Sequence, residues 1–167
     1  MRRKDREMDK DFALAVVDKC EYAALALFAA DGFPYCLPIT IARDGDHIYF
    51  HSAKEGKKIE ALHQDPHVCL ACVGDTQRLE HKFTTEFESA IVFGLAAEVT
   101  EKEEKLLALR LLCQRHNPDN MSKFAEAARK GLPRTAIWRI TIQEITGKRK
   151  KYDQEGKEMK FGRMEQC

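Results

Sequence analysis

The sequence predicts a mainly β fold of the α+β class: an antiparallel split β-barrel with helices on its periphery. Three observations support this prediction. Short apolar or alternating runs recur along the chain, Asp-Gly pairs separate the first of them, and short amphipathic segments lie between the later ones. Asp-Gly favours tight hairpin turns because glycine adopts a positive φ without steric cost. A doubly wound parallel sheet fits this early succession of hairpins poorly.

A helix and three strands are predicted in the first third of the chain. Phe12, Val16 and Cys20 recur every four residues, which indicates a helix over residues 11–20 with an aspartate to cap it. Apolar or alternating runs follow, separated by Asp-Gly turns. They predict a three-stranded meander over residues 22–30, 35–42 and 47–52.

Helices and strands alternate in the rest of the chain. Thr100 and Glu103 have the spacing of a capping box, which predicts that a helix begins at Thr100. Gly94 lies inside an extended stretch and marks a bulge or a close contact. Periodicity predicts helices at 57–63, 100–116 and 122–130, and strands at 67–73 and 135–146. Residues 84–99 are predicted as either one long bent strand or two strands.

Composition and charge indicate one globular domain. The chain has 167 residues, 44% of them hydrophobic, which suffices for a single core of ordinary size. Residues 1–147 are predicted to form this domain and residues 148–167 a basic, polar C-terminal tail. With 28 Lys and Arg against 27 Asp and Glu the formal net charge is +1. The chain therefore carries no electrostatic footprint for nucleic acid, and none is expected as a partner.

Neither membrane insertion nor export is expected. The longest uncharged apolar run, residues 22–30, is shorter than the roughly 20 residues of a membrane-spanning helix. The charged first residues lead into no apolar stretch of signal-peptide length. The expected location is the cytoplasm, and the six cysteines are expected to be reduced thiols.

Polar residues cluster where the strand at 47–52 ends and the next helix begins. Backbone N–H groups at a helix start, the Ser52 hydroxyl and the Lys57 ammonium can together neutralise a phosphate, and Gly56 lets the backbone approach it closely. The alternative is a solvated helix start with ordinary surface lysines. The spacing is neither that of a Walker loop nor that of a dinucleotide-binding glycine motif.

Cys69 and Cys72 form a Cys-x-x-Cys motif with His63 and His67 just upstream, so a zinc or redox site has to be weighed. Residues three apart in a strand point to opposite faces of the sheet, so the two thiols cannot easily share a metal ion or a disulfide. No metal site is therefore predicted. The other cysteines show no ligand spacing with this pair: Cys20, Cys36, Cys113 and Cys167.

Five segments, in a particular order, carry a family resemblance. They are RRKDRE at 2–7, DG at 31–32 with PY at 34–35 and Pro38, IYFHSAKEGKK at 48–58, ESAIVFG at 88–94 and ITGKR at 145–149. Together they resemble the flavin-binding split-barrel proteins related to pyridoxamine 5'-phosphate oxidase, especially the nitroimidazole-resistance branch. The Arg-x-His element with which the parent oxidase holds its substrate near its C-terminus is absent, because no histidine follows His116. This absence argues against pyridoxamine phosphate oxidation.

The resemblance implies a homodimer that holds two FMN molecules at its interface, each touched by both subunits. The resemblance assigns backbone contacts with the isoalloxazine ring to Pro38, Ile39 and Thr40. It assigns contacts with the ribityl chain to His51, Ser52 and Ala53. It assigns the phosphate to Lys57, Ser52 and Ser89, which agrees with the anion-site argument. By this resemblance His51 is the candidate catalytic group, and Lys148 is a contact across the dimer. The implied cofactor-binding residues are Pro38, Ile39, Thr40, His51, Ser52, Ala53, Gly56, Lys57, Ser89 and Lys148.

The expected activity is that of an FMN-dependent oxidoreductase. It would take hydride from NADH or NADPH and reduce a small acceptor such as a nitro compound. The acceptor would bind in a pocket at the dimer interface bounded by His51, with Phe87 or Trp138 as further walls. Two alternatives stay open: a non-catalytic flavin- or haem-binding protein, and a structural or interaction domain that shares only the fold.

Overall fold

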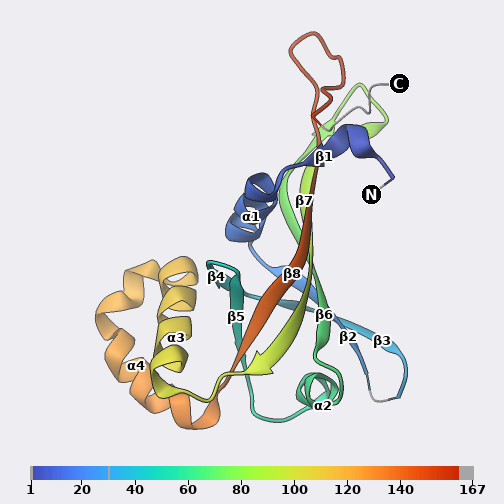
Figure 1. Cartoon of the computed structure of the whole chain (residues 1–167). Coiled ribbons are helices and arrows are strands. Elements are labelled where there is room, and N and C mark those ends of the chain that lie inside the picture. The colour runs from blue at the N-terminus through green and yellow to red at the C-terminus, as the bar shows by residue number, and fades with distance from the viewer. Residues whose placement is uncertain (1, 30, 162–167) are drawn as a thin grey trace.

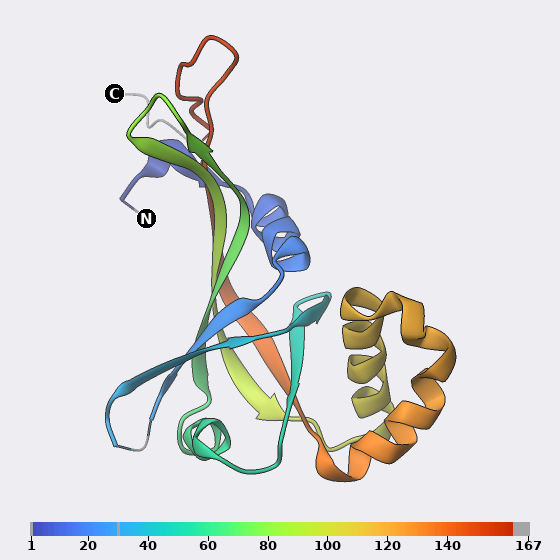
Figure 2. The same ribbon diagram turned by 180° about the vertical axis from the view of Figure 1, so that it is seen from behind.

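The computed structural model describes residues 2–29 and 31–161, and Figures 1 and 2 show the chain from opposite sides. One antiparallel sheet dominates this part of the chain, with strand order β3-β2-β6-β7-β8-β5-β4 and β1 paired with β8. The strands are β1 (Glu7–Met8), β2 (Ala23–Phe28), β3 (Pro34–Ile39), β4 (Ala42–Asp44), β5 (His47–Ser52), β6 (His67–Leu79), β7 (Thr84–Glu98) and β8 (Ala136–Lys150). The helices are α1 (Lys10–Lys19), α2 (Lys57–Gln64), α3 (Lys102–His116) and α4 (Phe124–Gly131), with 3-10 turns at Lys4–Arg6, Pro118–Lys123 and Leu132–Arg134.

The sheet curls without closing, so the predicted antiparallel split barrel is confirmed. β3 and β4 form its two edges, yet only Thr40 and Ile41 separate them along the chain. The chain therefore crosses from one edge to the other at this corner. The predicted three-stranded meander is wrong for the same reason: β3 pairs with β2, whereas β5 pairs with β4 and β8.

Local signals placed most helices and strands correctly. Strand β5 has the predicted bounds, and α1 begins after Asp9, whose carboxylate accepts a hydrogen bond from the Phe12 N–H (2.8 Å). The predicted capping box at Thr100 does not form, and α3 begins at Lys102 after an uncapped Glu101. The reason is that the Val99 N–H still donates to the Ile137 carbonyl (2.8 Å), so the chain leaves the sheet later than the sequence suggests.

Alternation along the central strands separates a core face from an outer face. Directly opposed residues of an antiparallel sheet share a face, and Leu25, Leu70 and Val92 lie opposite one another in β2, β6 and β7, fully buried. Phe50 and Trp138 stack in the same core with ring centroids 6.4 Å apart. The outer face, offset by one residue, carries small or apolar side chains that stay partly or fully exposed: Ala24, Ala26, Cys69, Ala71, Val73, Ile91 and Phe93. We call this set the outer sheet face.

β6, β7 and β8 continue past the barrel as an arm, at the opposite end of the molecule from α3 and α4 (Figures 1 and 2). The basic tail expected from Lys148 therefore begins later, because β8 runs to Lys150 and pairs with β7 along its length. The chain then folds back onto its own start: the Phe161 N–H donates to the Asp5 carbonyl (3.1 Å) and Arg6 Nε to Glu158 Oε1 (2.7 Å). Cys167 lies outside the described residues.

We expect Glu158→Gln to release the segment after β8 while lowering the global free energy of unfolding by less than about 1 kcal/mol. The hydrogen bond from Arg6, and then that from Lys160, lowers the pKa of Glu158 from 4.5 to about 2. The contribution of this carboxylate is therefore complete above pH 4.5 and is lost as the pH falls towards 2. Hydrogen exchange at neutral pH should accelerate over residues 152–161.

The matched control is Glu155→Gln, which neutralises an exposed carboxylate in the same segment. Its exchange should match that of the unaltered protein. Equal protection in the Glu158 variant and the control would show that the ion pair does not hold the segment.

Candidate functional site

The corner between β5 and α2 presents the predicted anion-binding residues. Gly56 precedes α2 with a φ of +114°, a conformation that a residue with a side chain rarely adopts. The N–H groups of Ile59 and Glu60 both donate to the Gly56 carbonyl, so those of Lys57 and Lys58 have no acceptor within the helix. These free donors lie at the positive end of the helix dipole, which favours an anion there.

The two lysines at the start of α2 point to different surroundings. Lys57 Nζ lies 3.1 Å from the Asp31 carboxylate and 5.3 Å from the Tyr35 ring centroid. Lys58 Nζ lies 5.5 Å from the Phe50 ring centroid, and burial lowers its pKa. Sequence reasoning missed Lys58, although it precedes the buried Leu62 by four residues and so shares a helix face with it.

His51 lines a cavity of about 380 Å³ between the barrel and the two helices α3 and α4. Burial, followed by Lys58 and His116, lowers the pKa of His51 below its usual 6.5, so the ring is neutral at neutral pH. Thr40, at the corner after β3, lines the same cavity. The structure therefore brings two of the predicted cofactor-binding residues, Thr40 and His51, to one cavity.

Helices α3 and α4 each line this cavity with one continuous stripe of residues. The residues from α3 follow the spacing i, i+3, i+4, i+7, and so do those from α4, which is the pattern of a single helix face. The stripes are Leu109, Leu112, Cys113 and His116 on α3, and Phe124, Ala127, Ala128 and Gly131 on α4. Asn117 and Thr135 complete the lining. We call this space the helix-pair cavity.

Polar contacts at both ends hold α3 against the barrel. Glu104 near its start accepts hydrogen bonds from the Tyr49 hydroxyl (3.1 Å) and from Arg139 (2.8 Å). At its end, Arg115 donates to the carbonyls of the last turn of α1, and His116 Nε2 donates to the Ile41 carbonyl (2.9 Å). One wall of the cavity is therefore fixed to the sheet.

Pro38, Ile39 and Ala53 differ in exposure. Pro38 and Ala53 are exposed, and the Ile39 side chain is buried in the core. Only the backbone of Ile39 can contact a ligand, as the family resemblance implied. The Ser52 hydroxyl lies next to His51 along the chain and donates to the Ala53 carbonyl (2.8 Å).

Ser89 and Lys148 lie far from His51 within one chain. They face each other across β7 and β8, whereas His51 faces Ile137, eleven residues earlier on β8 (148 − 137). At the rise of a β-strand this separation is about 35 Å, more than the length of a flavin mononucleotide. One chain therefore does not bring Ser89 and Lys148 to the same site as His51.

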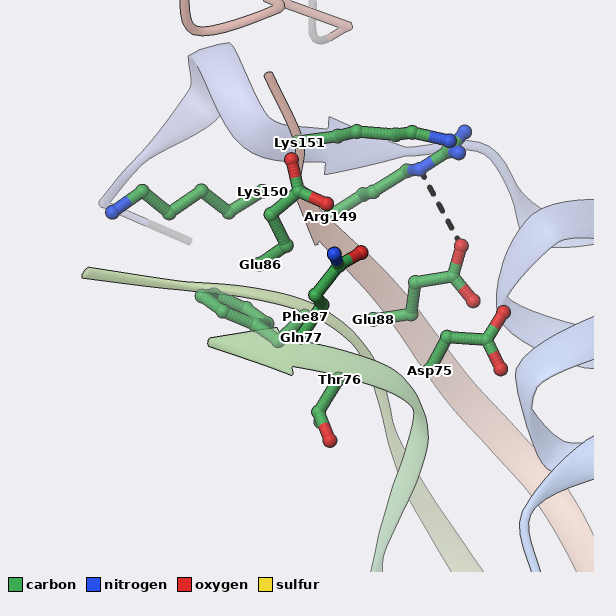
Figure 3. Close-up of a pocket in the computed structure, with 9 residues that line it drawn as sticks. All are labelled: Asp75, Thr76, Gln77, Glu86, Phe87, Glu88, Arg149, Lys150 and Lys151. Atoms are coloured by element: carbon green, nitrogen blue, oxygen red, sulfur yellow. Dashed lines mark ion pairs between the residues drawn. The ribbon is translucent and has the colours of Figure 1, made fainter. Parts of the chain in front are cut away.

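A second hollow of about 330 Å³ lies at the base of the arm between β6, β7 and β8 (Figure 3). Its walls are charged on both sides, and Arg149 Nε points at Glu88 Oε1 at 3.4 Å. Phe87 lines this hollow rather than the cavity beside His51. Trp138 is buried in the core against Phe50, so the expectation that it walls a pocket is wrong. Phe87, two residues from Ser89 on β7, would flank His51 only across a dimer.

The geometry of the Cys-x-x-Cys motif is as predicted. Cys72 is buried in the core, and Cys69 lies on the outer sheet face. Within residues 2–29 and 31–161, no three His, Cys, Asp or Glu side chains are grouped to hold a metal ion.

None of the helices in that part of the chain combines the length and the apolarity needed to cross a membrane.

Comparison with known proteins identifies the family. The pyridoxamine 5'-phosphate oxidase family matches residues 9–149, so the chain belongs to this family. No curated protein matches it.

Three solved structures share the fold. A candidate 5-nitroimidazole antibiotic resistance protein from Bacteroides thetaiotaomicron is 24% identical, with 85% of each chain covered and a TM-score of 0.72. An FAD- and haem-binding protein from Mycobacterium smegmatis is 20% identical over 87% of this chain and 73% of its own, with a TM-score of 0.73. An FAD-binding protein from Mesorhizobium loti is 22% identical over 86% and 96%, with a TM-score of 0.60. At these identities the likeness establishes the fold alone.

Proposed function

We propose that this protein is an FMN-dependent oxidoreductase that uses NADH or NADPH to reduce a small acceptor such as a nitro compound. The observation that carries the proposal is that Thr40 and the neutral His51 line one cavity, while Lys58 of α2, a helix that begins after Gly56, acts on the pKa of His51. Membership of the pyridoxamine 5'-phosphate oxidase family supports it, as do the flavin-binding proteins that share the fold.

The residues present fit the phosphate end of a flavin mononucleotide. The unpaired N–H groups at the start of α2, the Ser52 hydroxyl and the Lys57 ammonium are donors suited to a dianion. A phosphate would compete with Asp31 for Lys57. When bound, the flavin supplies the hydride chemistry, and this chain binds and orients it.

The ring end would lie along Pro38, Ile39 and Thr40, with Ala53 and His51 beside the ribityl chain. A neutral imidazole can both donate and accept a hydrogen bond, so His51 can contact a flavin or an acceptor without carrying charge into the site. His51 is therefore our candidate for the catalytic group.

A homodimer would bring the two distant groups of predicted residues together. Ser89 and Lys148 of one subunit could reach a flavin held at His51 of the other, which a single chain does not permit. The outer sheet face is a suitable surface for a second copy, because its alanines allow two sheets to approach closely.

A second candidate function is the binding of haem without turnover. The cavity holds two imidazoles, His51 and His116, in a mainly apolar setting, and histidine is a common axial ligand of haem iron. The haem-binding proteins that share this fold support the same alternative.

The test is an absorbance spectrum of the purified protein in the near-ultraviolet and visible range, before and after anaerobic addition of NADPH or NADH. A flavin double band that bleaches is the expected result. A Soret band would replace the flavin proposal by the haem alternative. A colourless protein that takes up no added FMN would leave neither function.

We expect His51→Ala to lower turnover about tenfold, since it removes one hydrogen-bonding group from the site. The fold should be unaffected, because the His51 side chain lines the cavity and is not part of the hydrophobic core. Steady-state kinetics with a fixed acceptor would measure the change, with His81→Ala, at the exposed tip between β6 and β7, as control. Identical kinetics in the two variants would exclude His51 from catalysis.

A further inference from the structure

The facing stripes of α3 and α4 do not fill the space between the helices. Side chains of packed helices normally interdigitate at close-packed density. Here α4 presents only small groups beyond Phe124, namely Ala127, Ala128 and Gly131, and a space of about 380 Å³ remains. This volume lies near the lower end of the range of ligand pockets, about 300 to 1,000 Å³, and suits a molecule with one ring.

The lining of the cavity, within the described part of the chain, contains no ammonium, guanidinium or carboxylate group. No Lys, Arg, Asp or Glu stands among the described residues that line it, in contrast to the hollow at the base of the arm. A charged ligand would lose its hydration there without gaining a counter-charge. The polar lining groups are hydroxyl, amide, thiol and imidazole groups, which suit an uncharged hydrogen-bonding substituent.

The polar groups and the apolar wall come from different elements. Leu109, Leu112 and Phe124 supply large apolar side chains from the helices, whereas Thr40 and His51 belong to the barrel. His116 is held in place by its bond to the Ile41 carbonyl. A ring between the helices would therefore meet apolar side chains, with the hydrogen-bonding groups of Thr40 and His51 on the barrel side and the held His116 at the end of α3.

We propose that the helix-pair cavity binds an uncharged molecule with a single aromatic ring, whose polar substituent reaches His51 or His116. The cavity lies within one chain and shares none of its described lining residues with the outer sheet face. Its role as the acceptor site rests on the proposed function, whereas binding itself requires no electron transfer. Ala127 and Ala128 then set the size of ring that enters.

The test uses two probes of similar shape, 4-nitrobenzyl alcohol and 4-nitrobenzoate, which differ in charge. Each is titrated into the purified protein while NMR follows the histidine ring signals. The alcohol should shift the signals of His51 and His116, but not that of the exposed His81, with a dissociation constant of about 1 mM or below. The carboxylate should bind at least about tenfold more weakly because its charge is unpaired in the cavity.

Two variants of α4 locate the binding. Ala127 lines the cavity from an exposed position, so Ala127→Trp should fill the space without disturbing the core and weaken binding of the alcohol at least about tenfold. Ala125→Trp, at an exposed position of the same helix outside the cavity lining, should leave binding unchanged. Thermal unfolding of both variants verifies that they fold.

Three results would overturn the proposal: equal binding of the two probes, equal binding by the two variants, or binding only to flavin-free protein. The last would place the flavin itself in the cavity. The visible spectrum of each sample keeps this test separate from that of the proposed function. A colourless protein that takes up no added FMN and binds the alcohol as expected would refute the flavin and retain the cavity site.

Discussion

Replacing Gly94 with alanine is expected to lower the free energy of unfolding by about 3 kcal/mol, the upper end of the range for overpacking. An added Cβ would lie 2.5 Å from the Thr141 carbonyl oxygen and 2.8 Å from the Ile140 side chain. The pairing of β7 and β8 shifts at this point, between Phe93 and Gly94. The clash involves backbone of a central strand, so relief would require β7 and β8 to separate. Urea unfolding of both proteins measures the difference.

Gly131→Ala is the matched control, because an added Cβ there would meet nothing closer than 4.0 Å and the backbone is helical. This change should leave stability unchanged or raise it by up to about 1 kcal/mol, as expected for glycine in a helix. Equal stability of the two variants would show that β7 and β8 do not approach closely at Gly94.

If the proposed homodimer packs through the outer sheet face, Ala71→Arg is expected to convert it to a monomer and to weaken the proposed FMN binding at least about 100-fold. Ala71 lies at the centre of the outer sheet face, between Ala24 and Ile91. An arginine there would leave the core of each chain intact but bury an unpaired charge between two sheets, at a cost of about 3 kcal/mol or more. That cost corresponds to about 100-fold in an equilibrium constant.

Sedimentation measures the oligomeric state, and titration with FMN measures the affinity. Ala125→Arg, an identical change on exposed α4, should leave both unchanged. A variant that stays dimeric and retains its flavin would place the interface elsewhere. A monomeric parent protein would refute the proposed homodimer, whereas monomers that still bind FMN fully would show that one chain suffices.

The candidate site could be predicted in part. Helix and strand signals placed Gly56 and Lys57 at the start of α2 and His51 at the end of β5, because both depend on neighbours within a few residues. Lys57 was predicted as a phosphate ligand, and no lysine was predicted beside His51, although Lys58 lies on the face of α2 that turns towards Phe50 and lowers the pKa of His51. His116 was not predicted at all, since 65 residues separate it from His51 along the chain (116 − 51).

The errors in the fold share one cause. Three predictions rested on neighbouring residues alone: the meander, the capping box at Thr100 and the tail from Lys148. Each is wrong because of a contact that β8 makes with another part of the chain. β8 pairs with β5 and with β7 and carries the chain past Lys148, and the Ile137 carbonyl retains Val99 in the sheet. None of these partners lies near its counterpart in the sequence.

The sequence by itself determined the type of most elements, the turns and the family. Periodicity, the Asp-Gly pairs and the five ordered segments are properties of neighbouring residues. Only the tertiary structure decided strand order, the open outer sheet face and the helix-pair cavity. An alternating strand fits many partners equally well, and the space left between two apolar stripes depends on how the helices carrying them pack.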